Sequence, residues 1–238
     1  MPGDAALEVA IAAKRYGARP VLHDVRFRAG AGEVLALLGA SGTGKSTTLR
    51  IAMGLDTAFE GHVRRPPGRL GVVFQEPRLL PWLNTADNLR LVADGAPVAD
   101  LLAEVGLAGA EGVMPLALSL GMARRAALAR ALAVQPTLLV LDEPFASLDA
   151  RRSAGLAALV ARRARERGTT VLLATHDLGP ALAIADRVLV LAGHPAGLQA
   201  DIACAAHPDP AALRAELLAG FPFLEAAAAA EDQPPMRR

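Results

Sequence analysis

The sequence predicts an α/β domain with a mostly parallel sheet. Short runs rich in Val, Leu and Ala alternate with segments of helical periodicity, which is typical of strand–helix–strand units. Four of these runs are almost continuously apolar, as strands covered on both faces of a parallel sheet usually are. They lie at residues 71–74, 137–141, 170–174 and 188–191.

The composition is compatible with one large domain. Of the 238 residues 53% are hydrophobic and only 3% aromatic, so we expect a core of Ala, Leu and Val. The 25 basic and 24 acidic residues leave a net charge of +1. The arginine clusters at 151–152 and 162–167 are interpreted as the solvated face of a helix, so no nucleic-acid partner is expected. The single cysteine, Cys204, excludes an internal disulfide.

The sequence contains no predicted secretory signal or membrane span. The N-terminal residues lack a basic segment followed by an apolar run. No charge-free apolar run reaches the roughly 18 residues that a span needs. We therefore expect a soluble, cytoplasmic protein that can still dock on a membrane component.

The remaining elements are expected in the following order. Strands at 9–13 and 34–38 come first, and the second leads directly into a helix at 45–53. Further helices are expected at 119–134, 150–167, 180–185 and 210–218.

Residues 84–118 interrupt the alternation, because they contain no clear strand and are punctuated by Gly and Pro. We therefore expect a helical insertion over about 84–133, within a core formed by about 1–83 and 134–200. A C-terminal helix and tail follow at about 201–238. From Glu225 onward the composition is typical of a frayed end.

The segment LALLGASGTGKSTTLR joins the strand at 34–38 to the next helix. Gly39, Gly44, Lys45 and Ser46 match G-x-x-x-x-G-K-[ST] in the strand–loop–helix context that this motif requires. The glycines allow several backbone N–H groups to face one anion, and the helix N-terminus adds its own N–H groups. Lys45 supplies a point charge for the β- and γ-phosphates, and Ser46 offers a hydroxyl to Mg²⁺. The predicted nucleotide contacts are Gly39, Ala40, Ser41, Gly42, Thr43, Gly44, Lys45, Ser46 and Thr47.

Lysine is rare in this chain. Only Lys14 and Lys45 are lysines among the 25 basic residues, and the others are arginines. A compact ammonium fits a curled phosphate loop where a planar guanidinium does not, so the lysine at position 45 supports the motif.

Polar residues follow three further apolar runs. Asp142 and Glu143 end TLLVLDEP, Gln75 follows GVVFQEP, and His176 follows TTVLLATHD. The carboxyl ends of parallel strands lie at one edge of the sheet, where ligands bind. We predict that Asp142 binds Mg²⁺ and that Gln75 reaches both Mg²⁺ and the attacking water. Glu143 is predicted to accept a proton from that water, and His176 to contact the γ-phosphate.

These motifs together resemble those of an ABC-type ATPase, the ATP-binding cassette of a transporter. Their order over about residues 5–195 is the family's: phosphate loop, Gln75, signature helix, LLVLDEP, SLD at 147–149 and His176. The resemblance implies a P-loop NTPase core with a mostly parallel sheet, an N-terminal antiparallel β part and an inserted α-helical subdomain. It also implies hydrolysis of ATP with Mg²⁺, by a homodimer that binds two ATP molecules between its subunits.

Residues 118–122, LSLGM, stand where the family has LSGGQ. In the family the serine and the second glycine contact the γ-phosphate bound to the other subunit, and both are kept here as Ser119 and Gly121. Leu120 and Met122 depart from the pattern. We still expect a working site, because Ser119 can cap its helix and Leu120 need only supply backbone there.

Two other residues take roles from the resemblance. Tyr16, in KRYGARPVL, stands where the family stacks an aromatic ring on adenine; the alternative is a half-buried tyrosine of a strand. Asp149 matches the family residue that reaches across the dimer.

The segment FQEPRLLPWLNTADNL at 74–89 is similar to that of importers for nitrate, sulfonates and taurine. This similarity implies integral-membrane permease subunits, an extracytoplasmic solute-binding protein, and a peripheral position at the cytoplasmic face of the membrane. Trp82 is either an anchor for the permease or a plug in the core of the insertion. The alternatives are a soluble ABC-type ATPase without transport, an exporter or lipid-transport cassette, and a degenerate cassette that binds ATP only as a structural module.

Overall fold

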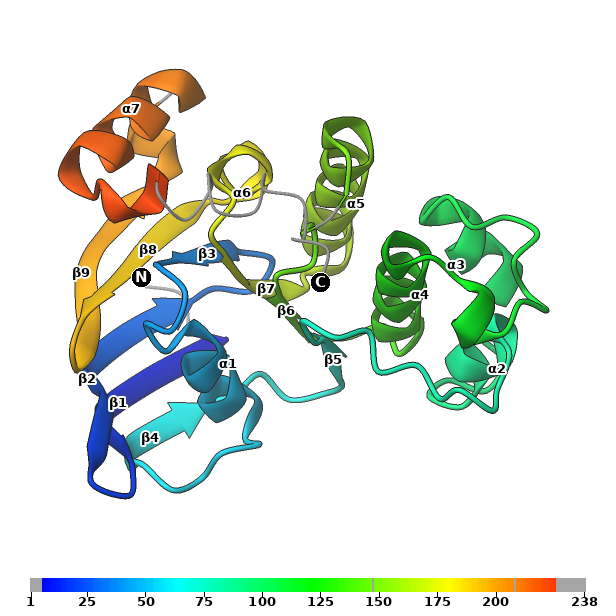
Figure 1. Ribbon diagram of the computed structural model, residues 1–238, viewed down its shortest axis with the longest axis horizontal. Helices are drawn as coiled ribbons and strands as arrows, with labels where there is room; N and C mark the ends of the chain where they lie inside the picture. Colours follow the sequence, from blue (N-terminus) through cyan, green and yellow to red (C-terminus); the bar gives the residue numbers. More distant parts are fainter. Residues whose placement is uncertain (1–5, 147, 208, 226–238) are drawn as a thin grey trace, which may run out of the picture.

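One sheet of nine strands runs through the molecule (Figure 1). The computed structural model describes residues 6–146, 148–207 and 209–225. The order across the sheet is β4-β1-β2-β9-β8-β3-β7-β6-β5. The strands are β1 Leu7–Tyr16, β2 Arg19–Ala29, β3 Val34–Leu38, β4 Glu60–Arg64, β5 Leu70–Val73, β6 Leu138–Asp142, β7 Thr170–Thr175, β8 Arg187–Gly193 and β9 Ala196–Ala203.

The strand directions divide the sheet into a parallel and a mainly antiparallel part. β3 pairs in parallel with β7 and β8, and β6 does so with β5 and β7. β1 is antiparallel to β2 and β4, and β9 is antiparallel to β8. The expected fold class is thereby confirmed, including the N-terminal antiparallel part.

Seven α-helices are present in the described residues, and local sequence explains where several of them begin and end. The helix α1 ends at Gly54 and α5 at Gly168, both in the left-handed conformation that favours glycine. The side chains of Ser119 and Asp149 cap α4 and α5. The helices are α1 Lys45–Met53, α2 Thr85–Arg90, α3 Val98–Glu104, α4 Leu120–Ala133, α5 Ala150–Arg167, α6 Leu178–Ile184 and α7 Pro210–Gly220, with 3-10 turns at Pro115–Ala117 and Cys204–Ala206.

The sheet is buried on both faces, and β3 shows how. Val34, Ala36 and Leu38 belong to one core cluster, together with residues of α4, α5 and α6. Leu35 and Leu37 belong to a second cluster, together with residues of α1, β1 and β2. Alternate side chains of a strand point to opposite faces, so this one strand contributes to both core clusters. The loop that follows β3 is therefore anchored at its start by a strand that is packed on both faces.

The structure corrects several of the predicted elements. Three strands were not predicted, namely β2, β4 and β9, and β1 is longer than the expected 9–13. The helix α6 begins at Leu178, two residues before the expected start. All residues of β4 are at least partly exposed and the buried positions of β2 alternate irregularly, so neither strand shows a clear hydrophobic period.

The segment expected as an insertion contains α2, α3 and α4, which lie together beyond the β5 edge of the sheet (Figure 1). The expected lack of strands at 84–118 is confirmed, whereas the boundaries of the subdomain remain a prediction. Ser147 and the tail after Glu225 lie outside the described residues. In the described ranges, no helix combines the length and the hydropathy that a membrane span requires.

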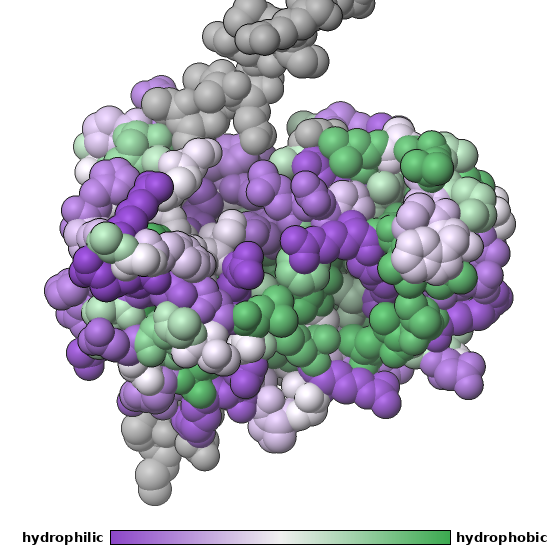
Figure 2. Space-filling view, turned by 60° about the horizontal axis from the view of Figure 1, so that its bottom comes forward, coloured by the Kyte–Doolittle hydropathy of each residue, from purple (hydrophilic) through white to green (hydrophobic). Residues whose placement is uncertain are grey.

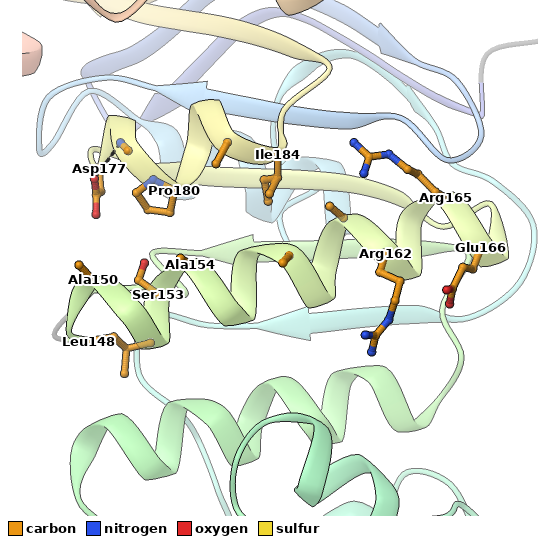
Figure 3. A pocket seen from close by; sticks show the side chains of 14 residues that line it. Leu148, Ala150, Ser153, Ala154, Arg162, Arg165, Glu166, Asp177, Pro180 and Ile184 are labelled. Carbon is orange, nitrogen blue, oxygen red and sulfur yellow. Dashed lines mark hydrogen bonds between the residues drawn. The ribbon is translucent and has the colours of Figure 1, made fainter. Parts of the chain in front are cut away.

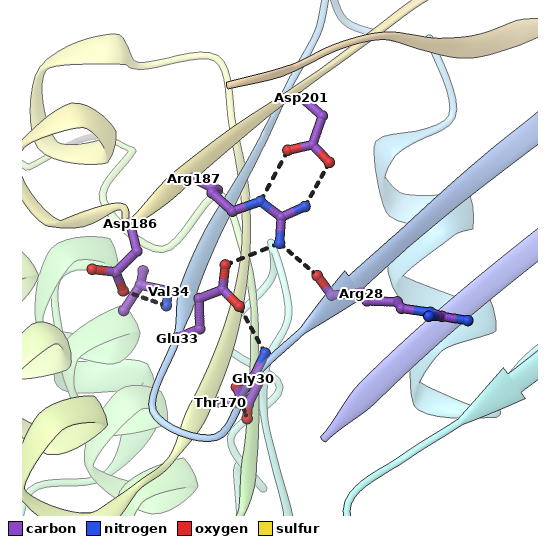
Figure 4. A network of polar contacts seen from close by, with 8 residues as sticks. All are labelled: Arg28, Gly30, Glu33, Val34, Thr170, Asp186, Arg187 and Asp201. Atoms are coloured by element: carbon purple, nitrogen blue, oxygen red, sulfur yellow. Dashed lines mark hydrogen bonds and ion pairs between the residues drawn. The ribbon is translucent and has the colours of Figure 1, made fainter. Parts of the chain in front are cut away.

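The guanidinium of Arg187 joins β8 to two other parts of the sheet (Figure 4). It donates to the two carboxylate oxygens of Asp201 in β9 at 2.9 and 2.5 Å. It also donates to Glu33 at 3.0 Å and to the backbone carbonyl of Arg28 at 2.8 Å. These bonds fix the turn between β2 and β3 against β8 and β9.

Replacing Arg187 by alanine is expected to lower the free energy of unfolding by about 1–3 kcal/mol, because it removes hydrogen bonds to charged groups that are only partly exposed. Unfolding in urea, followed by circular dichroism, measures the change. Arg26→Ala is the control, because Arg26 forms an exposed pair with Asp24, and little change is expected there. Equal losses in the two variants would contradict the stabilising role of the network.

Candidate functional site

The loop between β3 and α1 has a conformation that depends on its glycines. Gly42 and Gly44 have φ angles of +79° and +98°, in the region that L-residues with side chains rarely adopt. A Cβ on Gly39 would lie 2.6 Å from the carbonyl oxygen of Leu191, and one on Gly44 would lie 2.7 Å from a methyl group of Leu22. The curled loop therefore leaves no room for a side chain at either Gly39 or Gly44.

The ammonium of Lys45 lies inside this curl. Lys45 is the first residue of α1 and is 7% exposed. Its Nζ donates to the carbonyl oxygens of Gly39 at 2.7 Å and Ala40 at 3.2 Å. Thr43 closes the same turn by donating from its hydroxyl to Ala40 at 2.8 Å. The loop is thus preformed around a single buried positive charge.

The carboxylate of Glu143 lies beside this charge. Glu143 Oε1 is 3.8 Å from Lys45 Nζ and 2.9 Å from His176 Nδ1, and Oε2 accepts a hydrogen bond from Thr175 at 2.9 Å. Both Glu143 and His176 are buried. Glu143 also has a φ of +49°, a conformation that costs about 1–2 kcal/mol for a residue with a side chain. The predicted proton acceptor and the predicted phosphate contact are therefore in direct contact, in a locally strained segment.

Among the residues that line one cavity of about 340 Å³ next to the loop are the three predicted to bind Mg²⁺, Ser46, Gln75 and Asp142, and Glu76 also lines it. Burial raises the pKa of Asp142 above its ordinary value, a hydrogen bond with Ser46 opposes this shift, and the neighbouring Glu143 adds to it. Within the described residues, no cluster of three or more His, Cys, Asp or Glu exists that could bind a metal by itself. The hydroxyl of Ser46, the amide of Gln75 and the carboxylate of Asp142 suit Mg²⁺ that also binds phosphate oxygens, so the predicted residues fit this ion.

Tyr16 lies at a second cavity, of about 370 Å³, on the other side of the loop. The loop residues that line it are Gly42, Gly44, Lys45, Ser46 and Thr47. Ser46 therefore borders both cavities, and a nucleotide that places phosphates at Ser46 has room on the side of Tyr16. The ring of Tyr16, 49% exposed at the end of β1, is a cavity wall and not only a half-buried strand residue. Ser41 lies at the exposed tip of the loop.

The other predicted contacts lie on separate helices. Ser119 caps α4 by accepting from the N–H of Met122 at 3.3 Å, as expected, and Gly121 lies in the first turn. Asp149 caps α5 in the same way, accepting from the N–H of Arg152 at 2.9 Å. None of these three residues lines either cavity beside the phosphate loop. Their predicted contact with a nucleotide therefore requires a second subunit, and remains a prediction.

A third cavity, of about 800 Å³, lies between α5 and α6 (Figure 3). Its walls are mainly small apolar side chains such as Ala154 and Pro180, with Arg162 and Arg165 towards one end. Leu148 of the SLD motif lines it, but none of the predicted catalytic, nucleotide or Mg²⁺ residues does. Cavity size alone therefore does not identify the site in this molecule.

Comparison with known proteins identifies the family. Residues 22–146 match the family model described as ABC transporter. The chain belongs to the ABC transporter family. The cassette is 45% identical over 238 aligned residues to the aliphatic sulfonates import ATP-binding protein SsuB 2 of Burkholderia lata, covering 92% of this chain and 87% of the relative. It is 48% identical over 199 residues to SsuB 1 of Pseudomonas aeruginosa, covering 76% and 80% of the two chains.

Solved structures of ABC cassettes have the same fold. The dimeric ATP-binding cassette MJ0796, in a post-hydrolysis state with ADP and Pi, matches with a TM-score of 0.74 and 26% identity. The match covers 83% of this chain and 98% of that chain, and a second dimeric structure of MJ0796 matches equally well. The family and the assignment as an ATP-binding ATPase cassette, both expected from the motifs, are confirmed.

Three features of the cassette were missed or left open by the sequence. Thr175, which binds Glu143, was not predicted, although its hydroxyl interrupts the apolar run directly before His176. Trp82 is 70% exposed, so its interpretation as a plug in the core of the insertion is wrong. Arg124 of α4 donates to the carbonyl of Ala146, which links the signature helix to the segment after Glu143.

Proposed function

We propose that this cassette binds and hydrolyses ATP to energise an importer for aliphatic sulfonates or related small anions. The observation that carries the proposal is the buried cluster of Lys45, Glu143 and His176, which three separate elements bring to the phosphate loop. Identities of 44–48% to import proteins named for aliphatic sulfonates support the solute class.

Nucleotide binding is assigned to the two cavities that share Ser46. The backbone N–H groups of the loop and the Lys45 ammonium bind the phosphates, and adenine stacks on Tyr16. Ser46, Gln75 and Asp142 would hold Mg²⁺, which supplies charge neutralisation for the phosphates when bound. Ionisation of the Asp142 carboxyl becomes easier beside a cation, which offsets the effect of its burial.

Hydrolysis is assigned to Glu143 acting as general base on a water molecule in line with the γ-phosphate. Thr175 orients one carboxylate oxygen and His176 the other, so the base is already positioned. His176 is assigned to the γ-phosphate and Gln75 to the position of the water. Glu143 is buried, directly after a buried strand, which limits bulk water around the reacting groups.

Two subunits are required by this proposal, because Ser119, Gly121 and Asp149 lie away from the phosphate loop of their own chain. In the dimer, the start of α4 in one subunit caps the ATP bound to the other. The N–H groups of its first turn and the Ser119 hydroxyl face the γ-phosphate. The side chain of Leu120 is 52% exposed, and the Ser119 hydroxyl, whose oxygen accepts from the N–H of Met122, still has its own proton to donate to the γ-phosphate.

The proposed partners in the membrane are permease subunits, with a solute-binding protein on the opposite side and this cassette at the cytoplasmic face. Apolar side chains gather on the side of the helical insertion (Figure 2). In the insertion and the segment directly before it, the large exposed apolar side chains outside the start of α4 are those of Trp82, Leu91, Val92, Met114 and Leu116. Exposed apolar groups of this size commonly mark protein–protein contacts, so we assign the surface around Trp82 to the permease.

The test is reconstitution of the cassette with its permease in liposomes. Hydrolysis of ATP is expected to rise when the solute-binding protein is loaded with an alkanesulfonate, and transport of the sulfonate should follow. A response to nitrate but not to sulfonates would reject aliphatic sulfonates as the transported solutes. Hydrolysis that never responds to any loaded binding protein would reject the importer.

Replacing Ser119 by alanine is expected to lower the hydrolysis rate by about tenfold or more, because a hydrogen-bond donor to the transferred phosphate is lost. Phosphate release at saturating ATP measures the rate. Asn84→Ala is a matched control, because Asn84 caps α2 in the same way, with an N–H to Oδ1 distance of 2.8 Å, but lies outside the site. Equal losses in both variants would mean that Ser119 acts only as a helix cap.

A further inference from the structure

Tyr16 is fixed by two residues that the motifs do not include. Its hydroxyl donates to Asp56 Oδ2 at 2.9 Å. Lys14 Nζ donates to Asp56 Oδ1 at 2.7 Å and to the carbonyl of Ala58 at 2.8 Å, and lies 4.4 Å from the centroid of the Tyr16 ring. The ring is therefore held at its edge by a carboxylate and on one face by an ammonium.

The ion pair of Lys14 and Asp56 is buried, whereas the Tyr16 side chain that it contacts is not. The side chain of Lys14 is 2% exposed and that of Asp56 is 10% exposed, whereas Tyr16 keeps about half of its surface accessible. Burial would raise the pKa of Asp56, but the hydrogen bonds from Lys14 and Tyr16 outweigh it and keep the pKa below its usual value. The carboxylate is thus ionised and accepts from both neighbours at neutral pH.

The identity of residue 14 fits the same geometry. Lys14 and Lys45 are the only lysines among 25 basic residues; Lys45 lines the cavity that Tyr16 borders, and Lys14 lies against the Tyr16 ring. One compact ammonium reaches a carboxylate, a carbonyl and a ring face at once, which the planar fork of a guanidinium does not do in the same space.

Asp56 also lies just after the C-terminal end of α1, the helix that begins in the phosphate loop. It follows Gly54, where α1 ends, and the first turn of α1 contains Lys45 and Ser46. Tyr16 lines the cavity that these two residues border. The ring is therefore tied to the helix that binds the phosphates, although the two contacts join residues 40 and 42 positions apart in the chain.

We propose that Lys14 and Asp56 are positioning residues for Tyr16: Lys14 covers one face of the ring and Asp56 fixes its hydroxyl, so that the opposite face receives the nucleobase. This inference rests on the proposed stacking of adenine on Tyr16. A ring that is already ordered loses less side-chain freedom when ATP binds. Releasing it is expected to weaken ATP binding by about threefold to tenfold.

The experiment is calorimetric titration of Mg-ATP and of Mg-tripolyphosphate, which has no base. Tyr16→Phe removes only the hydroxyl and keeps the ring and the Lys14–Asp56 pair, so it tests the inference even where Asp56→Asn impairs folding. Both variants are expected to bind ATP about threefold to tenfold more weakly and tripolyphosphate as the wild type does. In a Tyr16→Ala background, Asp56→Asn is expected to have no further effect on ATP affinity.

Glu8→Gln serves as the control. Glu8 lies on the same strand, about 26 Å from Tyr16 at the usual rise per residue, and pairs with Arg28. It should change neither affinity. Thermal unfolding of each variant shows whether the fold is kept.

Each other outcome overturns the inference in a distinguishable way. If Tyr16→Ala weakens ATP binding but Tyr16→Phe and Asp56→Asn do not, stacking stands and positioning is wrong. If Tyr16→Ala leaves ATP binding unchanged, both the stacking and the positioning are wrong. If Asp56→Asn weakens tripolyphosphate binding equally, or adds to Tyr16→Ala, Asp56 acts through α1 and not through the ring.

Discussion

Replacing Glu143 by glutamine is expected to reduce ATP hydrolysis by about 10²- to 10⁴-fold, which is the usual contribution of a general base. The amide keeps an oxygen for Thr175 and presents an NH₂ group to His176, so the local packing survives. It cannot accept the proton of the attacking water. ATP affinity should therefore remain within a few-fold of the wild type.

Phosphate release and calorimetric ATP binding measure the two effects of Glu143→Gln separately. Light scattering adds a third readout, since the stalled variant should convert from the 24.6 kDa monomer to a dimer when Mg-ATP is present. Adding Ser119→Ala should prevent this conversion. Glu60→Gln, at an exposed position of β4, is the control and should hydrolyse ATP normally. Hydrolysis by Glu143→Gln within about threefold of the wild type would remove Glu143 from the proposed role.

Replacing Lys45 by arginine is expected to weaken ATP binding by about 10²-fold and to abolish measurable hydrolysis, even though the positive charge is kept. A charge-assisted contact contributes about 1.5–3 kcal/mol, and its loss corresponds to about one to two decades in affinity. The ammonium occupies the curl of the loop, 2.7 Å from the carbonyl of Gly39 and 7% exposed. A guanidinium is too broad for this space without opening the loop.

Calorimetric titration of Mg-ATP into Lys45→Arg and Lys45→Met tests this prediction. If shape and charge are both needed, the two variants lose similar affinity. Near-normal binding by Lys45→Arg together with a large loss in Lys45→Met would show that charge alone is sufficient, and that the narrow loop does not select lysine. Arg26→Lys, an exposed position outside the site, is the control and should bind normally.

Much of the parallel half of the fold is readable along the chain. The strands β3, β6 and β7 are short runs of Val, Leu and Ala whose side chains are almost all buried. Short, continuously apolar runs of this kind are readily recognised as buried strands. Helix α5 has its expected bounds because Asp149 caps its start and Gly168 ends it in the left-handed conformation.

The antiparallel half was less predictable. β4 is an edge strand with no fully buried residue, and its sequence, EGHVR, has no apolar alternation. β2 begins with Arg19 and Pro20, and its buried positions Leu22, Val25, Phe27 and Ala29 do not keep a strict period of two. These strands exist because their partners supply the hydrogen bonds, and pairing of this kind leaves little trace in local sequence.

The sequence by itself was sufficient to identify the phosphate loop, the acidic pair and the family. Each of these motifs is a short contiguous segment that is recognised from its residue types and their spacing. Only the tertiary structure decided that Thr175 and His176 both bind Glu143, that Trp82 is exposed, and that Lys14 and Asp56 hold Tyr16. The contacts among Glu143, Tyr16 and the residues that hold them include pairs that are up to 42 positions apart. Their side chains meet because the sheet sets the order and register of its strands, and that arrangement is a property of the whole packed chain.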